Sequence, residues 1–117
     1  QSFYKKTRKE MKRQNLQKIM TLAWQFVRRN GFSMSEALRQ AWLVFKTKAN
    51  LYKGITKFYF RKVDGTIREA WGTLNSSLMP KIDESGDRRA KNPTVQVYYD
   101  TERQEFRCFK VANLLSL

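Results

Sequence analysis

The sequence predicts an α+β protein in which a basic N-terminal helix and an αα-hairpin precede a small antiparallel β-barrel. Up to about residue 53, apolar residues recur at steps of three and four, which is the period of an amphipathic helix. From Gly54 onward the period falls to two, which is the period of a β-strand. Asp64-Gly65 then stands between two apolar runs and gives a strong hairpin signal. We therefore expect three segments, at residues 1–15, 16–53 and 54–117.

The helical half begins with a basic arm, residues 1–15, that is rich in helix-forming residues but has almost no apolar face. In residues 16–53, Asn30-Gly31 predicts the end of the first hairpin helix, because glycine readily adopts the left-handed conformation found there. Ser33 and Glu36 have the spacing of a capping box and predict where the second helix begins. The expected inward-facing residues are Leu16, Ile19, Met20, Ala23, Trp24, Phe26, Val27, Ala37, Leu38, Ala41, Trp42 and Phe45.

Residues 54–117 read as short strands joined by turns. The runs "ITKFYFRKV" and "TIREAWGTL" form one expected hairpin, and "TVQVYYD" and "EFRCFK" form a second, after a polar loop at residues 83–93. Asp100, Glu102 and Glu105 are expected to mark a solvated turn in the second hairpin, and residues 111–114 are expected to form a closing helical turn. Four or five short strands in this span predict a small, strongly bent barrel. Its expected core and closing residues include Phe58, Phe60, Val97, Tyr99, Phe109 and Leu114.

The composition argues against an enzyme, a cofactor and a metal site. The chain has no histidine, and Cys108, the single cysteine, cannot form an intramolecular disulfide or a thiolate zinc site. We expect Cys108 to be a small buried residue of a strand. The sequence has no phosphate-binding glycine motif and no paired-carboxylate site flanked by apolar residues. No apolar run is long enough to span a membrane, so we expect a cytoplasmic location in a host cell, with a virion as the alternative.

The positive charge is unevenly distributed and indicates a polyanionic partner. Net charge is +14, and residues 1–53 hold 13 Lys/Arg against 2 acids, a net of +11. Residues 54–117 hold 11 Lys/Arg against 8 acids, a net of only +3. Phosphate binding needs only well-placed cations, so a basic helix suffices for binding without sequence preference. The candidate nucleic-acid contacts are Lys5, Lys6, Arg8, Lys9, Lys12, Arg13, Arg28, Arg29, Arg39, Lys46, Lys48, Lys57, Arg61, Arg88 and Arg89.

Two further features have a functional and a structural interpretation. The two hairpin helices could form a helix-turn-helix whose recognition face holds Ser35, Arg39, Gln40 and Lys46. Without a third helix, however, packing against the barrel is the better interpretation. Alternation also places three aromatic side chains away from the expected core, where they could stack on bases or cover the second helix. These are Tyr59, Trp71 and Tyr98.

The motifs "KxDGTIREAxGTLN" and "YYDxExxxFRxFKxxNL" resemble a known family. They are similar to the small WYL-related proteins of bacteria and phages, which have an Sm-like or SH3-like β-barrel, and the resemblance covers about residues 54–117. It implies an Sm/SH3-like barrel. Larger WYL regulators are thought to bind nucleotides or nucleic acids, which makes Arg107 and Tyr98 candidate ligand contacts. The second arginine of the family signature is replaced here by Asn113, and the Trp-Tyr-Leu tripeptide by Val97-Tyr98-Tyr99.

These observations favour a non-enzymatic nucleic-acid-binding protein, encoded by a phage or mobile element, whose affinity comes mainly from contacts to phosphates. The alternative is a small inhibitor or adaptor that occupies the polyanion-binding channel of a host nucleoprotein or docks on the acidic patches of that nucleoprotein. A virion-packaged protein is a third interpretation. DNA or RNA fits the charge equally well, because both present the same phosphates.

Overall fold

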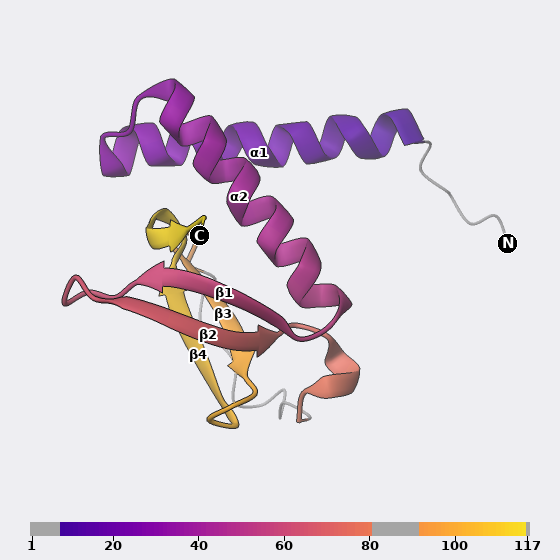
Figure 1. Cartoon of the computed structure of the whole chain (residues 1–117). Coiled ribbons are helices and arrows are strands. Elements are labelled where there is room, and N and C mark those ends of the chain that lie inside the picture. Colours follow the sequence, from indigo (N-terminus) through magenta and orange to yellow (C-terminus); the bar gives the residue numbers. More distant parts are fainter. Residues whose placement is uncertain (1–7, 81–91, 117) are drawn as a thin grey trace, which may run out of the picture. The chain divides into compact units, whose positions relative to one another are not determined.

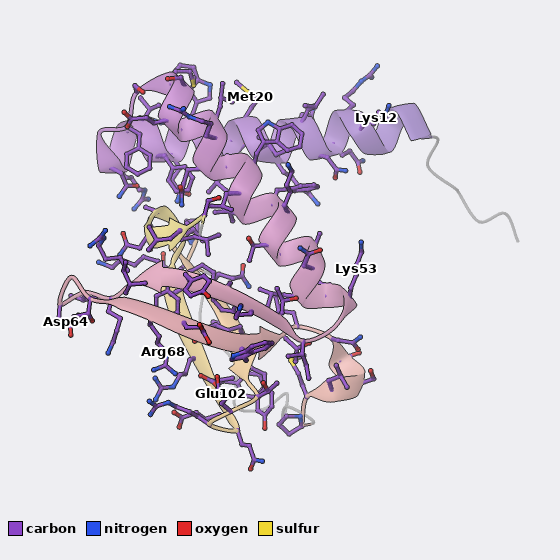
Figure 2. The ribbon with its side chains drawn as sticks, viewed as in Figure 1. Lys12, Met20, Lys53, Asp64, Arg68 and Glu102 are labelled. Atoms are coloured by element: carbon purple, nitrogen blue, oxygen red, sulfur yellow. The ribbon has the colours of Figure 1, made fainter. Side chains whose placement is uncertain are left out.

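A computed structural model describes residues 8–80 and 92–116, with side chains from residue 12 onward (Figures 1 and 2). The chain divides into two compact units, one ending at Trp42 and the other beginning at Leu43. Lys5 and Lys6, with Arg88 and Arg89, lie outside the described residues.

The first unit contains α1 (Arg8–Asn30) and the first part of α2 (Met34–Lys53). The predicted boundary between the helices is confirmed, since Gly31 has a φ of 69°. The Ser33 Oγ accepts a hydrogen bond of 3.2 Å from the backbone N–H of Glu36, as an N-cap residue should. The Phe32 ring lies 5.6 Å from that of Phe26, so apolar contact also joins the two ends. α1 continues through residue 15 without a break.

The buried stripe of each helix lies beside the predicted one. On α1 the buried residues are Ile19, Ala23 and Phe26, whereas Leu16, Met20 and Trp24, which we expected to face inward, are exposed. Ile19, Ala23 and Phe26 follow one another at steps of four and three, so they form a single narrow line along the helix. On α2 the buried line is Ala37, Ala41, Val44 and Leu51, and the expected inward residue Trp42 is exposed.

The last turns of α2 belong to the second unit. Leu51 is fully buried, and its carbonyl accepts hydrogen bonds from the Leu74 N–H (2.8 Å) and the Thr73 hydroxyl (3.1 Å). The Asn75 side-chain amide donates to the carbonyl of Lys53 over 3.2 Å. These bonds satisfy carbonyls that the end of a helix leaves without intrahelical partners. The C-terminal end of α2 is therefore fixed to the strand region that follows.

The second unit is a five-stranded antiparallel sheet in the order β4-β3-β2-β1-β5 (Figure 1). β4 and β5 lie at opposite edges of this order, yet only the three residues of the 3₁₀ turn η3 join them. Such a short connection forces the sheet to curl until its edges approach each other. The elements are β1 (Thr56–Arg61), β2 (Ile67–Thr73), η1 (Ser76–Leu78), β3 (Val95–Asp100), β4 (Glu105–Lys110), η3 (Val111–Asn113) and β5 (Leu114–Leu115).

Both predicted hairpins are confirmed. In the first, Gly65 has a φ of 91°, and the Asp64 carboxylate accepts a 2.9 Å hydrogen bond from the Thr66 N–H. In the second, Gln104 takes the left-handed conformation with a φ of 54°. The predicted closing turn is η3, and the short strand β5 that follows it pairs with β1.

Aromatic rings fill the concave side of the sheet, which we call the inner face. The rings of Phe58, Phe60, Tyr98 and Phe109 lie within 6.0 Å of one another in five pairs. The prediction that Val97 and Tyr99 are core residues is wrong, because β3 presents Tyr98 and Asp100 to the inner face. Tyr99 instead meets Phe106 on the outer face, at 5.2 Å between ring centroids.

Candidate functional site: an inner cationic pocket and an outer aromatic face

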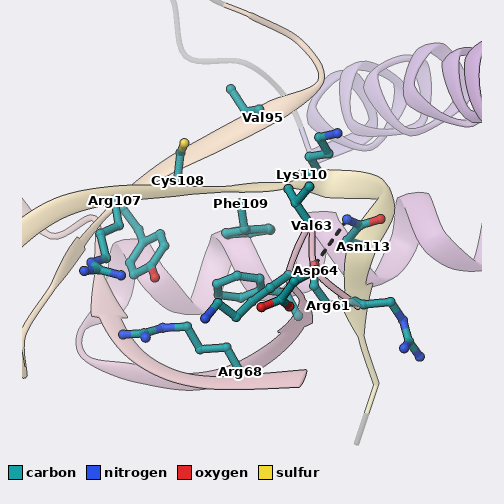
Figure 3. Close-up of a pocket in the computed structure, with 13 residues that line it drawn as sticks. Arg61, Val63, Asp64, Arg68, Val95, Arg107, Cys108, Phe109, Lys110 and Asn113 are labelled. Carbon is teal, nitrogen blue, oxygen red and sulfur yellow. Dashed lines mark hydrogen bonds between the residues drawn. The ribbon is translucent and has the colours of Figure 1, made fainter. Parts of the chain in front are cut away.

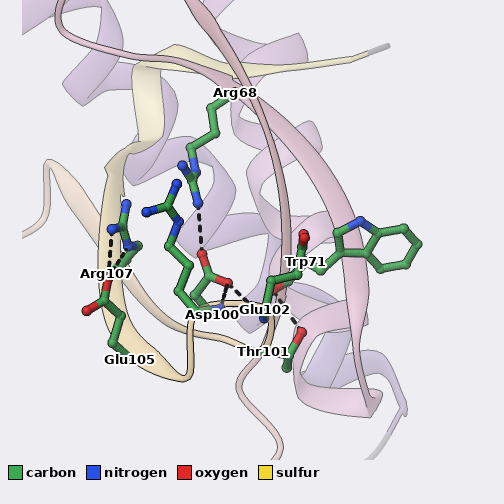
Figure 4. Close-up of polar contacts among 8 residues, drawn as sticks. Arg68, Trp71, Asp100, Thr101, Glu102, Glu105 and Arg107 are labelled. Carbon is green, nitrogen blue, oxygen red and sulfur yellow. Dashed lines mark hydrogen bonds and ion pairs between the residues drawn. The ribbon is translucent and has the colours of Figure 1, made fainter.

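One end of the inner face is polar and centres on Asp100, which is only 1% exposed. Its carboxylate forms an ion pair with Arg68 at 3.1 Å and accepts hydrogen bonds from the backbone N–H groups of Glu102 and Arg103, each at 3.0 Å (Figure 4). Burial acts to raise the pKa of Asp100, but the hydrogen bonds from Arg103, Arg68 and Glu102 together outweigh it and lower the pKa below 3.8. Asp100 is therefore a buried anion that holds both the turn and Arg68.

A second ion pair lies beside the first. Arg107 contacts Glu105 at 2.7 Å, and the hydrogen bond to Glu105 raises the pKa of Arg107 above its ordinary value (Figure 4). Strand pairing sets Arg107 directly opposite Tyr98, so the two share the inner face. Half-exposed ion pairs of this kind contribute little to stability. Glu105 instead fixes where the Arg107 guanidinium lies.

The inner face opens into a pocket of about 660 Å³ that is lined in part by the buried rings of Phe60 and Phe109 (Figure 3 labels Phe109). Five of its lining residues are cationic and one is acidic, which makes the pocket attractive to anions. Asn113 donates a 3.2 Å hydrogen bond to the Arg61 carbonyl across the pocket rim (Figure 3). The complete lining is Phe60, Arg61, Lys62, Val63, Asp64, Arg68, Val95, Tyr98, Arg107, Cys108, Phe109, Lys110 and Asn113.

Two buried polar atoms beside this pocket, the Tyr98 hydroxyl oxygen and the Arg68 Nε, have no hydrogen-bond partner among the described residues. Burial, and then the negative charge of Asp100, raise the pKa of Tyr98 above 10.0, so its hydroxyl stays neutral and keeps its proton. Both atoms are therefore donors. Unpaired buried donors beside a cationic pocket are suited to an anionic group such as a phosphate or carboxylate.

The convex side of the sheet, which we call the outer face, carries a different group of residues. The Lys57 ammonium lies 5.6 Å from the Trp71 ring centroid and 5.9 Å from that of Tyr59. The Tyr59 hydroxyl donates a 3.1 Å hydrogen bond to Glu69, which fixes the direction of the ring. Trp71 is 38% exposed and points away from the two ion pairs (Figure 4). This face can offer aromatic rings and a cation to the same ligand.

The structure places many predicted nucleic-acid contacts on exposed positions. Lys57 and Arg61 lie on the outer side of β1. Lys57 lies near Tyr59 and Trp71, whereas Arg61 donates to the Gly65 carbonyl at the hairpin turn. Arg8 and Lys9 belong to α1, although only their backbone is described. The exposed cations predicted on the helices are Lys12, Arg13, Arg28 and Arg29 of α1 (Figure 2, Lys12) and Arg39, Lys46 and Lys48 of α2. On the helix-turn-helix face, Ser35 is exposed and Gln40 is half-buried.

Three expectations need correction. Tyr98 is fully buried, so it cannot stack on a base as an exposed aromatic, although it remains beside the pocket with Arg107. Asp100, expected in a solvated turn, is buried because it follows Tyr98 on the inner face. Cys108 is exposed and not buried, because it pairs with Val97 on the outer face.

Sequence reasoning overlooked Arg68 as a partner of Asp100, since 32 residues separate them along the chain. The overlooked signal is local. Asp100 stands directly before the residues of a hairpin turn, where an aspartate accepts hydrogen bonds from the backbone two and three residues ahead. An aspartate that serves a turn in this way can face inward.

A small antiparallel sheet that curls until a 3₁₀ turn joins its two edges defines the Sm/SH3-like class of β-barrel. A family model described as WYL_2, Sm-like SH3 beta-barrel fold, matches residues 44–115, and the chain belongs to this family. The match begins inside α2, close to the point where the second compact unit begins. No curated protein and no solved structure showed a significant match to the chain.

Neither described helix is long and apolar enough to cross a membrane. Among the described residues, no three acidic or cysteine side chains gather in a way that could hold a metal ion.

Proposed function

We propose that this protein is a non-enzymatic nucleic-acid-binding protein whose affinity comes mainly from contacts to backbone phosphates. The observation that supports the proposal most strongly is the high positive charge of α1. Its 23 residues contain seven Lys/Arg and one acid, and the cations whose side chains are described are all exposed. A rigid helix holds such cations at fixed spacings along its length, about 1.5 Å per residue. α1 therefore presents an extended positive surface to a polyanion.

Charge on this scale is more than folding requires, because like charges repel one another and destabilise the compact state. With a net charge of +14, this chain is destabilised by such repulsion when no partner is bound. Phosphate contacts compensate by releasing counterions condensed on the nucleic acid, and this release provides most of the free energy of non-specific binding. The excess charge is thus best explained by a polyanion that neutralises it.

Neutralising α1 should test this role. The triple variant Lys12→Gln, Arg13→Gln, Lys18→Gln removes three exposed cations from α1. We expect weaker binding to a duplex oligonucleotide and a log–log salt slope that is less steep by about 0.9 for each lost phosphate contact. Fluorescence anisotropy over a range of salt concentrations measures both quantities.

The control removes exposed cations that lie neither on α1 nor on the pocket lining, through Lys53→Gln, Arg103→Gln, and the change in salt slope is compared per cation removed. We expect a smaller change in the salt slope, since these residues lie outside the proposed surface. Equal changes in both variants would show that net charge alone drives binding, and unchanged binding in the α1 variant would contradict the role of α1. A stoichiometric protein partner that survives nuclease treatment in a pull-down would support the adaptor alternative.

A further inference from the structure

We propose that the outer face of β1 and β2 is a stacking platform for the unpaired bases of a single-stranded nucleic acid. The proposal rests on the proposed function and specifies its preferred form of substrate. The platform consists of Tyr59 and Trp71, with Lys57 between them. It lies on the side of the sheet opposite the inner pocket.

Strand register brings these three residues together. Lys57 pairs with Trp71 across the two strands, and Tyr59 pairs with Glu69. Tyr59 and Trp71 are therefore diagonal neighbours on one face, with backbones roughly 7 to 8 Å apart. The spacing allows each ring to meet a different base of an extended strand. Because both rings project from strands of a folded barrel, their positions are fixed before a ligand binds.

The charges around the rings suit a nucleic-acid backbone. The Lys57 ammonium lies within 6 Å of both ring centroids, so a base on either ring brings its phosphate near this cation. Arg61 lies two residues beyond Tyr59 on the same face, is exposed, and donates through Nη1 to the Gly65 carbonyl at 3.0 Å. Glu69 is the acidic residue of this face on β2, and its carboxylate accepts the Tyr59 hydroxyl. Lys57 is thus the cation beside the rings, while Arg61 is engaged at the hairpin turn and Glu69 is engaged by Tyr59.

The exposure of Trp71, beside the half-buried Tyr59, favours a single strand over a duplex. Trp71 is 38% exposed, and an aromatic side chain of that size on an otherwise folded strand offers its ring surface to a flat partner. In a duplex, the bases already stack on one another and hide their faces from a protein. In a single strand the faces are free, and stacking on aromatic side chains tolerates any base sequence.

The substitution Trp71→Ala tests the platform. We expect it to weaken binding of a mixed-sequence single-stranded oligonucleotide by about 5-fold to 150-fold, the range for loss of one stacked base. Binding of the corresponding duplex, which depends on phosphates, should change by less than about 2-fold. The matched control is Trp24→Ala, because Trp24 is also an exposed tryptophan, at 47%, but lies on α1. We expect this control to leave the ratio of single-strand to duplex affinity unchanged.

A second measurement reports on the folded protein without removing Trp71. In the variant Trp24→Phe, Trp42→Phe, Trp71 is the only tryptophan, and we expect single strands to quench its fluorescence more strongly than duplex does. Equal quenching by both, or an unchanged single-strand affinity in Trp71→Ala, would overturn the platform. If the unaltered protein bound neither form, the proposed function itself would fail. Duplex binding that persists while both platform tests fail would leave the proposed function standing.

Discussion

Replacing Asp100 with alanine should lower the free energy of unfolding by about 3 kcal/mol or more, which is the usual cost of removing one partner of a buried ion pair. Asp100 is 1% exposed and the Arg68 side chain 16%, so water can compensate only part of the lost interaction. The substitution also removes the acceptor for two backbone N–H groups in the β3–β4 turn. Chemical denaturation monitored by circular dichroism measures the loss.

The control is Glu105→Ala, which removes an acidic residue from the same hairpin but breaks an exposed ion pair. We expect the free energy of unfolding to fall by less than about 1 kcal/mol, because exposed ion pairs contribute little to stability. An Asp100→Ala protein as stable as Glu105→Ala would contradict a structural role for the buried pair.

The same carboxylate makes stability depend on pH. Its pKa in the folded protein is below 3.8, so its ionised form is favoured by folding. The stabilisation is therefore complete above about pH 4 and is lost as the pH falls through the lowered pKa. The Asp100→Ala protein should lose less stability between pH 5 and pH 3 than the unaltered protein does.

Replacing Gly72 with alanine should destabilise the barrel by about 1–3 kcal/mol, as overpacking of a filled core does. A Cβ at this position would lie 2.5 Å from Tyr98 Cδ2 and 3.2 Å from the carbonyl oxygen of Tyr99. Tyr98 is fully buried against Phe58 and Phe109, so its ring cannot move aside freely. Thermal and chemical unfolding of the variant measure the effect.

The matched control is Gly54→Ala. Nothing lies within 4 Å of a Cβ built there, and Gly54 does not have a left-handed φ. We expect a neutral or slightly stabilising change, because alanine restricts the unfolded chain more than glycine does. Equal stability of the two variants would contradict the close contact between Gly72 and Tyr98.

Local signals in the sequence predicted most of the fold. Gly31, Ser33 and Asp64-Gly65 each specify backbone geometry within a few residues, and the structure confirms the helix boundary and the hairpin at those positions. The change of period at Gly54 likewise marks the step from helix to strand. Such features depend on short-range sterics and hydrogen bonds, so one sequence suffices to find them.

Which face of each helix and strand is buried was harder to predict. In "TVQVYYD" both sets of alternating residues, which lie on opposite faces of the strand, include apolar or aromatic side chains. Alternation alone therefore does not decide which face is buried. The choice depends on Asp100, whose buried state requires Arg68 from another strand. The pocket likewise combines side chains from β1, β2, β3, β4 and η3, and Arg107 was found through the family resemblance. Long-range pairing of this kind leaves little trace in a single sequence.

The most direct test of nucleic-acid binding is the salt dependence of affinity for the unaltered chain. Anisotropy of a labelled duplex, measured from low to physiological salt, should give a straight log–log plot with a slope of about −2.7 or steeper, corresponding to at least three phosphate contacts. Such a slope would support binding through contacts to phosphates. Measurable affinity that stays constant over this range, or no binding even at low salt, would contradict the proposed function.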